Sequence, residues 1–342
     1  MIVGPSWVGD MVMAQSLFRL LSERRHASID VIAPEWSLPV LARMPEVRAG
    51  IALPVAHGEF GLRKRRQAGR QLSATEYVEA IVLPRSLKAA LVPWFAGIPK
   101  RTGFLGEFRY GLINDVRPLD RSVLDQTVKR FLALGLRRGE ALPEIPRPQL
   151  EISDENQQRL IASLGLAIDK PVIALLPGAE YGPAKCWPLD YFRELASLLQ
   201  AAGFTVWIMG SAADAMAGEH IAATGAASNI CGKTGLADAI DLLACAQQAV
   251  SNDSGLMHVA AAAGIQVNVI YGSSTPTYTP PLTAKRQIHY LDIDCSPCFE
   301  RQCPLGHLHC LRNISPQTVL AGIQDHIHDK RRTSYEHGAK SE

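Results

Sequence analysis

The chain has 342 residues, of which 47% are hydrophobic and 20% charged, and its formal net charge is +2. At about 150 residues per domain this length predicts two domains, and the composition supplies enough apolar side chains for buried sheets. The near-neutral charge argues against nucleic-acid binding, which is typical of strongly basic domains. No apolar segment reaches the ~20 residues that a bilayer span requires, and the N-terminus lacks a secretory signal pattern. We therefore expect a cytoplasmic protein with reduced cysteines.

The first half alternates strand and helix patterns. Strands are expected at 1–3, 29–33, 51–54 and 80–83, and helices at 12–21 and 129–136. Residues 141–148 then hold three prolines. Because proline continues neither a helix nor an interior strand, we expect the interdomain linker there.

The second half repeats the alternation. Strands are expected at 172–176, 205–209, 249–251 and 267–271, and a helix at 191–202 ends before Gly203. Alternating strands and helices predict parallel sheets. The sequence therefore predicts an α/β protein with two Rossmann-like, doubly wound domains that face a cleft. Their ranges are 1–148 and 149–329, and a polar tail follows at 330–342.

Two turns in the second half carry the residues of a phosphate site. Lys185 lies in P-G-A-E-Y-G-P-A-K-C-W-P after the apolar run 172–176, and N-D-S-G-L-M-H, residues 252–258, follows the run 245–250. Ligands of open α/β sheets lie beyond the carboxyl ends of strands, and a helix N-terminus favours a phosphate. The two turns predict a diphosphate site in which Lys185 acts as a point charge and His258 as a ligand. A solvated lysine and a packing or capping histidine are the alternatives.

The turn after the first expected strand has a different character. G-P-S-W-V-G-D, residues 4–10, has glycine spacing similar to a P-loop, but Asp10 stands where a P-loop has its lysine. A carboxylate repels phosphate, so we expect this turn to face another group. Asp10 is then either a general base or a helix N-cap.

Positive charge is clustered in one segment. Arg63, Lys64, Arg65 and Arg66 are consecutive, and Arg70 follows. The simplest interpretation is a solvated face of the protein surface. If these side chains line the cleft, they would attract an anionic acceptor, and peripheral contact with a membrane surface is a third interpretation.

Four cysteines lie close together near the end of the chain. Cys295, Cys298, Cys303 and Cys310 have the spacing C-x2-C-x4-C-x6-C. In a reduced protein this cluster predicts either a structural metal clip that holds zinc or iron, or four free thiols.

Several segments together resemble a known family. G-P-S-W-V-G-D-M, L-P-R-S-L-K-A-A-L-V-P, G-I-P-K-R-T-G, P-G-A-E-Y-G-P-A-K-C-W-P and N-D-S-G-L-M-H-V-A-A-A resemble the ADP-heptose:lipopolysaccharide heptosyltransferases of glycosyltransferase family 9, nearest to the heptosyltransferase II branch. The resemblance runs in the same order from Gly4 to about Leu320. It implies a GT-B fold whose first domain binds the acceptor and whose second binds the donor.

The resemblance also implies an activity and its residues. The expected reaction transfers L-glycero-D-manno-heptose from ADP-heptose to the first heptose of the lipopolysaccharide inner core, with inversion at the anomeric carbon. Asp10 matches the proposed catalytic base and Lys185 the lysine that neutralises the leaving diphosphate. The residues that match donor contacts are Glu180, Tyr181, Lys185, Asp214, Asp253, Ser254, Gly255 and His258. Those that fall where the family gathers charge for the acidic acceptor are Arg63, Lys64 and Arg66.

The partners and location follow from the same resemblance. We expect a nucleotide-sugar donor and a lipid-linked oligosaccharide acceptor, met at the cytoplasmic face of the inner membrane. No cofactor is expected for the chemistry, because protein cations can take the place of a divalent ion. The cysteine cluster occurs in only part of the family, so a metal there does not follow from the resemblance.

Three alternatives remain from the sequence. The first is another GT-B heptosyltransferase, I or III, with a different acceptor. The second is a Rossmann-type nucleotide-binding oxidoreductase, which would need a G-x-G-x-x-G turn that we do not find. The third is a catalytically inert membrane-surface protein that uses the basic run.

Overall fold

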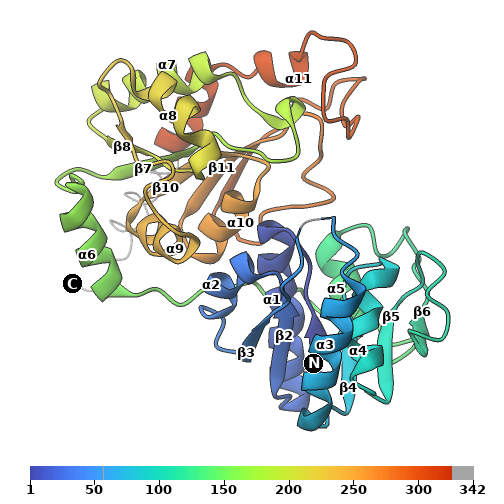
Figure 1. Ribbon diagram of the computed structural model, residues 1–342. Helices are drawn as coiled ribbons and strands as arrows, with labels where there is room; N and C mark the ends of the chain where they lie inside the picture. The colour runs from blue at the N-terminus through green and yellow to red at the C-terminus, as the bar shows by residue number, and fades with distance from the viewer. Residues whose placement is uncertain (57, 326–342) are drawn as a thin grey trace, which may run out of the picture. The chain divides into compact units, whose positions relative to one another are not determined.

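The structure, a computed structural model, describes residues 1–56 and 58–325, so the predicted polar tail at 330–342 lies outside the described residues. The chain forms two compact units (Figure 1). Unit 1 comprises Met1–Glu151 and Thr277–Leu282, and unit 2 comprises Ile152–Pro276 and the described residues from Thr283 onward. The main division therefore falls just after the proline-rich segment 141–148.

Unit 1 contains a six-stranded parallel sheet in the order β3-β2-β1-β4-β5-β6. Its strands are β1 (Ile2–Val3), β2 (Ile29–Ala33), β3 (Val47–Ala52), β4 (Glu79–Val82), β5 (Lys100–Phe104) and β6 (Asp115–Arg117). Its helices are α1 (Val8–Arg25), α2 (Leu38–Leu41), α3 (Leu62–Leu72), α4 (Leu91–Phe95) and α5 (Thr127–Gly135). Helix α1 packs against α5, and α3 packs against α4.

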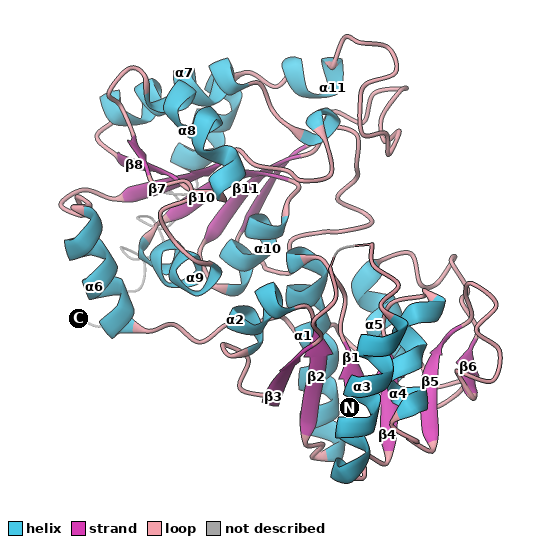
Figure 2. Ribbon diagram, in the orientation of Figure 1, coloured by secondary structure: helices cyan, strands magenta, loops and turns pink. Residues whose placement is uncertain are grey.

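Unit 2 contains a second six-stranded parallel sheet, in the order β12-β11-β10-β7-β8-β9. Its strands are β7 (Val172–Leu176), β8 (Thr205–Ile208), β9 (Ser228–Asn229), β10 (Gln248–Asn252), β11 (Gln266–Ile270) and β12 (Arg286–His289). Its helices are α6 (Asp154–Leu164), α7 (Leu189–Ala201), α8 (Ala215–Ala222), α9 (Leu236–Cys245), α10 (Gly255–Ala262) and α11 (His309–Arg312). Figure 2 shows α7 and α8 on one face of this sheet and α9 and α10 on the other.

Both sheets have the same topology. Renumbered within its own unit, each sheet has the strand order 3-2-1-4-5-6 of a Rossmann fold. The order reverses between β1 and β4 in unit 1 and between β7 and β10 in unit 2. Ligands of such sheets bind beyond the carboxyl ends of the strands at this switch point. The fold therefore points to the loops after these four strands.

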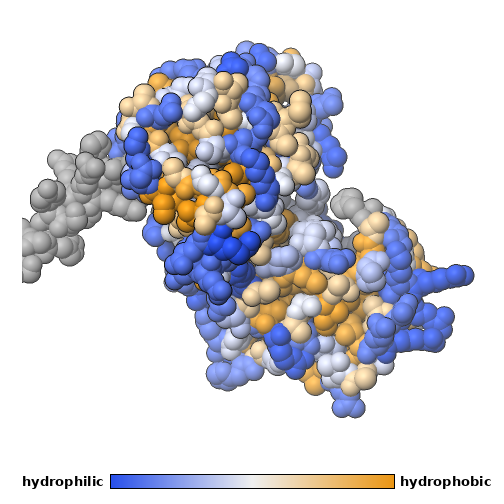
Figure 3. Space-filling view, turned by 60° about the vertical axis from the view of Figure 1, so that its left-hand side comes forward, coloured by the Kyte–Doolittle hydropathy of each residue, from blue (hydrophilic) through white to orange (hydrophobic). Residues whose placement is uncertain are grey.

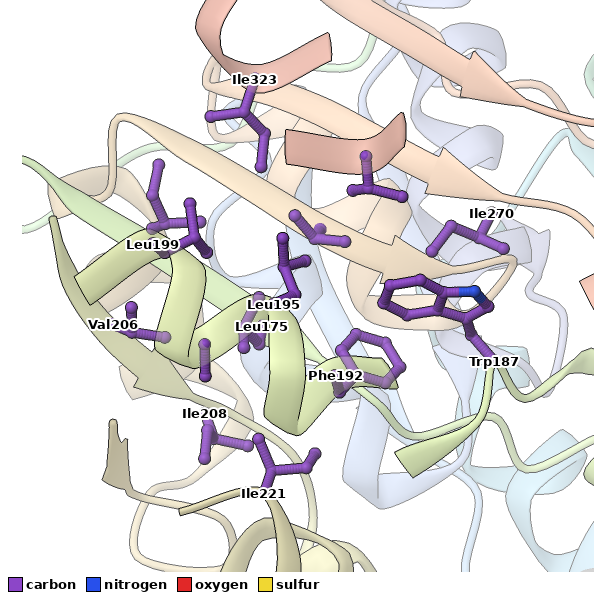
Figure 4. Close-up of a cluster of buried hydrophobic side chains, with 14 of the residues drawn as sticks. Leu175, Trp187, Phe192, Leu195, Leu199, Val206, Ile208, Ile221, Ile270 and Ile323 are labelled. Atoms are coloured by element: carbon purple, nitrogen blue, oxygen red, sulfur yellow. The ribbon is translucent and has the colours of Figure 1, made fainter. Parts of the chain in front are cut away.

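The core of unit 2 explains why its central strands are so apolar. Helices cover both faces of the sheet, so every residue of β7 is buried. Figure 4 shows Leu195 and Leu199 of α7 beside Leu175 of β7 and Val206 of β8. Burying each such side chain contributes roughly 1.5–3 kcal/mol. The cluster holds the carboxyl ends of β7 and β8 in place below the loops that follow them.

One segment of the second half of the chain belongs to unit 1. Thr277–Leu282 lies between β11 and β12 in sequence. Its Tyr278 carbonyl accepts a hydrogen bond from the backbone N–H of Thr127 at 3.3 Å. Arg130 of α5 donates to the Tyr278 hydroxyl at 2.7 Å and lies 4.9 Å from the centroid of its ring. The chain therefore returns to unit 1 and packs on α5, a connection that the sequence did not predict.

The predicted parallel α/β architecture is confirmed, with differences at the sheet edges. The strands at 29–33 and 172–176 were predicted to the residue, whereas β5, β6, β9 and β12 were missed. β5 reads K-R-T-G-F and β12 reads R-Q-I-H, and polar residues dominate both. The outer strands have less apolar surface to bury, so their sequences lack the hydrophobic run on which the prediction rested.

Candidate active site

The switch point of unit 2 brings together the loops that the sequence assigned to a donor site. β10 pairs in parallel with both β7 and β11. The loop 177–188 follows β7, Asp253 follows β10 directly, and the loop 271–276 follows β11. Because the carboxyl ends of parallel strands meet at one edge of the sheet, these three loops converge there.

Lys185 and Asp253 form an ion pair at the centre of these loops. Lys185 Nζ lies 2.5 Å from Asp253 Oδ2, and their side chains are 18% and 5% exposed. The same carboxylate oxygen accepts a hydrogen bond from Ser274 Oγ at 2.6 Å. Lys185 is therefore not a solvated surface lysine. An ammonium has three donors, so this pair leaves up to two N–H groups for a ligand.

The loop of Lys185 is fixed by aromatic and backbone contacts. The ring centroid of Tyr181 lies 5.0 Å from Lys185 Nζ and 5.4 Å from Arg301 Cζ. The Tyr181 hydroxyl donates to the Phe299 carbonyl at 2.5 Å. Gly182 has φ 152°, and a Cβ there would lie 2.5 Å from the Arg301 carbonyl oxygen. Only glycine fits this close approach, which brings the loop against residues 299–301.

The N-terminus of α10 lies beside the ion pair. The helix begins at Gly255 with Ser254 as its N-cap, and the Ser254 side chain makes no cap hydrogen bond. His258, in the first turn, is buried, and burial lowers its pKa to about 4, with Asp253 opposing the shift and Lys185 adding to it. His258 is therefore neutral near pH 7. As the predicted phosphate ligand it would therefore act without a positive charge, and a neutral imidazole still donates or accepts a hydrogen bond.

Two further residues of the predicted donor site follow β7 and its neighbour β8. Glu180 is exposed in the loop after β7. Asp214 caps a short helical turn, since its Oδ2 accepts hydrogen bonds from the N–H and the hydroxyl of Ser211, each at 2.8 Å. A Cβ on Gly178 would lie 2.6 Å from Asp214 Oδ1. Asp214 therefore caps the turn after β8, and its carboxylate packs closely against the loop after β7 at Gly178.

In unit 1, Asp10 lies at the corresponding switch point. Helix α1 begins at Val8, which puts Asp10 in its first turn, where the helix dipole favours a carboxylate. The N-cap is Trp7, without a side-chain cap hydrogen bond. The alternative interpretation of Asp10 as the N-cap is therefore wrong. Its half-buried position after β1, the strand next to β4, is consistent with a functional carboxylate.

The basic run forms helix α3, whose arginines face different surroundings. Arg63, Arg66 and Arg70 line an open hollow of about 340 Å³ together with two glutamines. Lys64 instead pairs with Glu59 at 3.0 Å, and Arg65 is buried, donating to the Phe60 carbonyl at 2.8 Å. The structure thus brings Arg63 and Arg66 together with Arg70, which the sequence did not assign to the acceptor site, and separates Lys64 from them.

The cysteine cluster gives no support to the predicted metal clip. Within residues 1–56 and 58–325, no three His, Cys, Asp or Glu side chains meet in a group that could hold a metal ion. Cys310 belongs to the hydrophobic core, and burial, followed by the other three thiols, raises its pKa. Cys303 differs, because backbone N–H groups of Leu308 and then of residues 305–307 lower its pKa.

Comparison with known proteins identifies the family. Residues 65–309 match the family described as "Glycosyltransferase family 9 (heptosyltransferase)". Lipopolysaccharide heptosyltransferase 2 of Escherichia coli K12 is 42% identical over 333 residues, which cover 94% of this chain and 96% of that protein. Lipooligosaccharide heptosyltransferase 2 of Haemophilus influenzae is 41% identical, with 95% and 98% covered. The chain belongs to glycosyltransferase family 9.

A solved family 9 structure extends this result to the fold. The Escherichia coli ADP-heptose LPS heptosyltransferase II has a TM-score of 0.87 to this glycosyltransferase and 40% identity, covering 96% of this chain and 98% of that one. The predicted GT-B fold is thereby confirmed. Another Escherichia coli heptosyltransferase, solved with ADP, has a TM-score of 0.71 at 19% identity and shows the shared fold alone.

Membership of family 9 excludes two of the three functional alternatives that the sequence left open. It sets aside the oxidoreductase and the inert surface protein, because the chain is a glycosyltransferase. The sequence analysis overlooked Ser274 and Arg301, which contact Asp253 and Tyr181 of the candidate site. A signal for Ser274 was present, since G-S-S-T at 272–275 directly follows a predicted strand. Arg301 had no comparable signal, because it lies far from any central strand in sequence.

Proposed function

We propose that this glycosyltransferase transfers L-glycero-D-manno-heptose from ADP-heptose to the first heptose of the lipopolysaccharide inner core, with inversion at the anomeric carbon. The observation that carries the proposal is the Lys185–Asp253 pair at the switch point of unit 2, in a chain that matches relatives named heptosyltransferase 2 over nearly its whole length. A heptosyltransferase 1 of Pseudomonas aeruginosa matches only 39% of this chain, at 31% identity. This difference favours the acceptor of heptosyltransferase II over that of heptosyltransferase I.

Unit 2 binds the donor in this proposal. The N-terminus of α10 at Ser254 and Gly255 offers backbone N–H groups to the diphosphate, and Lys185 adds a positive charge. Both would stabilise the departing ADP electrostatically, and stabilisation of this type is usually the largest single contribution to catalysis. His258 serves as a neutral hydrogen-bonding group, and Glu180, Tyr181 and Asp214 contact the nucleotide sugar.

Unit 1 binds the acceptor and supplies the base. Asp10 takes the proton from the acceptor hydroxyl as its oxygen bonds to the anomeric carbon. The bond between that carbon and the diphosphate oxygen breaks, and ADP leaves with the electron pair. Because attack and departure occur on opposite faces, one such displacement inverts the anomeric configuration. Protein cations neutralise the leaving group, so we expect no cofactor beyond the donor itself.

Helix α3 binds the acidic acceptor and contacts the surface of the membrane that holds the acceptor. Arg63, Arg66 and Arg70 present three cations to one hollow, and Phe60 and Leu62 at the start of the helix are 50% and 47% exposed. Figure 3 shows hydrophobic patches among hydrophilic residues on the face of the molecule that it draws. Arginine beside exposed apolar side chains favours peripheral contact with an anionic membrane. No helix among the described residues is long and apolar enough to cross a membrane. We place the enzyme at the cytoplasmic face of the inner membrane.

The proposal is tested by product analysis. The purified chain is incubated with ADP-heptose and lipopolysaccharide cores that carry zero, one or two heptoses, and the products are read by mass spectrometry. We expect one heptose to be added to the core that carries one. Addition only to the heptose-free core, or only to the core with two, would identify the I or III activity instead.

A further inference from the structure

Ser274 lies in the donor site and has no part in the chemistry described so far. It follows β11 in the loop G-S-S-T, and it is 4% exposed. Its hydroxyl donates to Asp253 Oδ2 at 2.6 Å. This is the same oxygen that lies 2.5 Å from Lys185 Nζ. The three side chains thus form one hydrogen-bonded chain, which runs from the end of β11 through β10 to the ammonium in the loop after β7.

The backbone of this loop is held without help from the Ser274 hydroxyl. The N–H of Ser273 donates to the Ala184 carbonyl at 3.1 Å, and the N–H of Phe299 donates to the Ser273 carbonyl at 2.7 Å. The Ser296 hydroxyl donates to the Gly272 carbonyl at 2.7 Å. Removing the Ser274 hydroxyl therefore leaves the loop in place and changes only what Asp253 contacts.

Asp253 is better suited to holding Lys185 than to binding the donor directly. A carboxylate in contact with a diphosphate would repel it, since both are anions. A lysine stem has many rotamers, so a fixed carboxylate decides where the ammonium points. With two donors on one oxygen, the orientation of the carboxylate is determined by Ser274 as well as by Lys185.

We propose that Ser274 is a positioning residue for the donor: it fixes the Asp253 carboxylate so that Lys185 presents its remaining N–H groups to the diphosphate. The inference rests on the proposed function, because it takes a nucleoside diphosphate sugar as the ligand. Ser274 itself need not touch the donor. Its effect reaches the donor through Asp253 and Lys185.

The test compares Ser274→Ala with Ser273→Ala. A hydrogen bond to a charged group contributes enough that its loss should lower donor kcat/KM and ADP affinity about tenfold or more, with acceptor KM unchanged. Ser273 is the matched control, because its buried hydroxyl has no hydrogen-bond partner among the described residues. Ser273→Ala should therefore keep the donor kinetics and ADP affinity of the unmodified enzyme.

A second background separates positioning from a general loss of structure. In Asp253→Asn the ion pair with Lys185, through which Ser274 acts, is already lost. Adding Ser274→Ala to this variant should therefore change donor kcat/KM and ADP affinity less than twofold. The proposal is overturned if Ser274→Ala binds ADP as tightly as Ser273→Ala, if its loss is equal in both backgrounds, or if it lowers only the melting temperature. Failure of the unmodified enzyme to transfer heptose would reject the proposed function instead, and calorimetry with ADP would still decide the role of Ser274.

Discussion

Asp10 and Lys185 each follow the central strand of a sheet, yet their surroundings differ. Lys185 is paired with a buried carboxylate, whereas Asp10 lies half-buried in the first turn of α1. The sequence singled out both from their place after an apolar run. Lys185 lies in the segment after β7 as predicted, whereas Asp10 lies inside α1 and not in the predicted turn. The sequence could not supply the partner of Lys185, because Asp253 is 68 residues away and only strand pairing brings the two together.

Replacing the carboxylate of Asp10 tests its role as the base. Asp10→Asn keeps the shape of the side chain but cannot accept the acceptor proton. Turnover should fall at least ~10²-fold, the usual contribution of a general base, while ADP affinity by calorimetry should not change because Asp10 belongs to unit 1. Near-normal turnover in Asp10→Asn would remove this residue from the mechanism.

The four clustered thiols should differ in reactivity. Thiolate is the reactive form, and backbone N–H groups lower the pKa of Cys303 whereas burial raises that of Cys310. In the folded protein at neutral pH, a limiting amount of iodoacetamide should therefore label Cys303 first and Cys310 last, as peptide mass spectrometry can show. Equal protection of all four thiols, relieved together by a chelator, would contradict this order and point to a shared metal.

At the scale of elements, the helical periodicity of α3 places some of its basic side chains on one face and the others elsewhere. Arg63, Arg66 and Arg70 are three, four and seven positions apart and so share one helical face, and they line one hollow. Lys64 and Arg65 point elsewhere, to Glu59 and to the Phe60 carbonyl. The sequence predicted the cluster but assigned no helix to this segment, so it could not show that Arg70 shares a face with Arg63 and Arg66 or that Lys64 lies away from that face.

The hollow can be tested against a control on the same helix. Changing Arg63, Arg66 and Arg70 to Gln should raise acceptor KM about fivefold per residue, if each cation contributes about 1 kcal/mol near an anionic surface. The salt dependence of acceptor KM should flatten, and donor KM should stay the same. Lys64→Gln removes the same charge from a residue already paired with Glu59, so its effect should be smaller. An equal effect of Lys64→Gln, or a change confined to donor KM, would reject the hollow as the acceptor surface.

The central strands were predictable because a strand that is buried on both faces of its sheet has a continuous run of apolar residues. β7 is V-I-A-L-L and entirely buried, and it was predicted to the residue. The edge strand β9 has only two residues, and three of the four residues of β12 are polar, so neither strand has a recognisable apolar run. The same reason explains the site: Lys185 follows a central strand and was found, whereas Arg301 lies in a segment without helix or strand and was not.

At the scale of the whole molecule, the chain is not a simple sequence of two domains. The prediction divided it at 148/149, but Thr277–Leu282 belongs to unit 1. Nothing in T-Y-T-P-P-L distinguishes this segment from an ordinary loop, since its partner α5 lies about 150 residues earlier, as the 148-residue separation of Arg130 and Tyr278 shows. A fragment that ends at residue 148 or 151 would therefore lack part of the unit it is meant to contain.

The contribution of this segment should appear in the stability of the full chain. Tyr278→Ala removes both the hydrogen bond from Arg130 and the ring that lies 4.9 Å from its guanidinium, whereas Tyr278→Phe removes only the hydrogen bond. A hydrogen bond to a charged group contributes about 1.5–3 kcal/mol and a cation–π contact about 0.5–1 kcal/mol. In urea unfolding, the midpoint concentration should therefore be highest for the unmodified chain, lower for Tyr278→Phe and lowest for Tyr278→Ala. Intrinsic fluorescence and hydrogen exchange at α5 should locate the loss in unit 1, because the segment packs there. If both variants unfold at the same urea midpoint as the unmodified chain, the segment contacts α5 without stabilising unit 1. In that case a fragment ending at residue 151 should be as stable as unit 1 in the full chain.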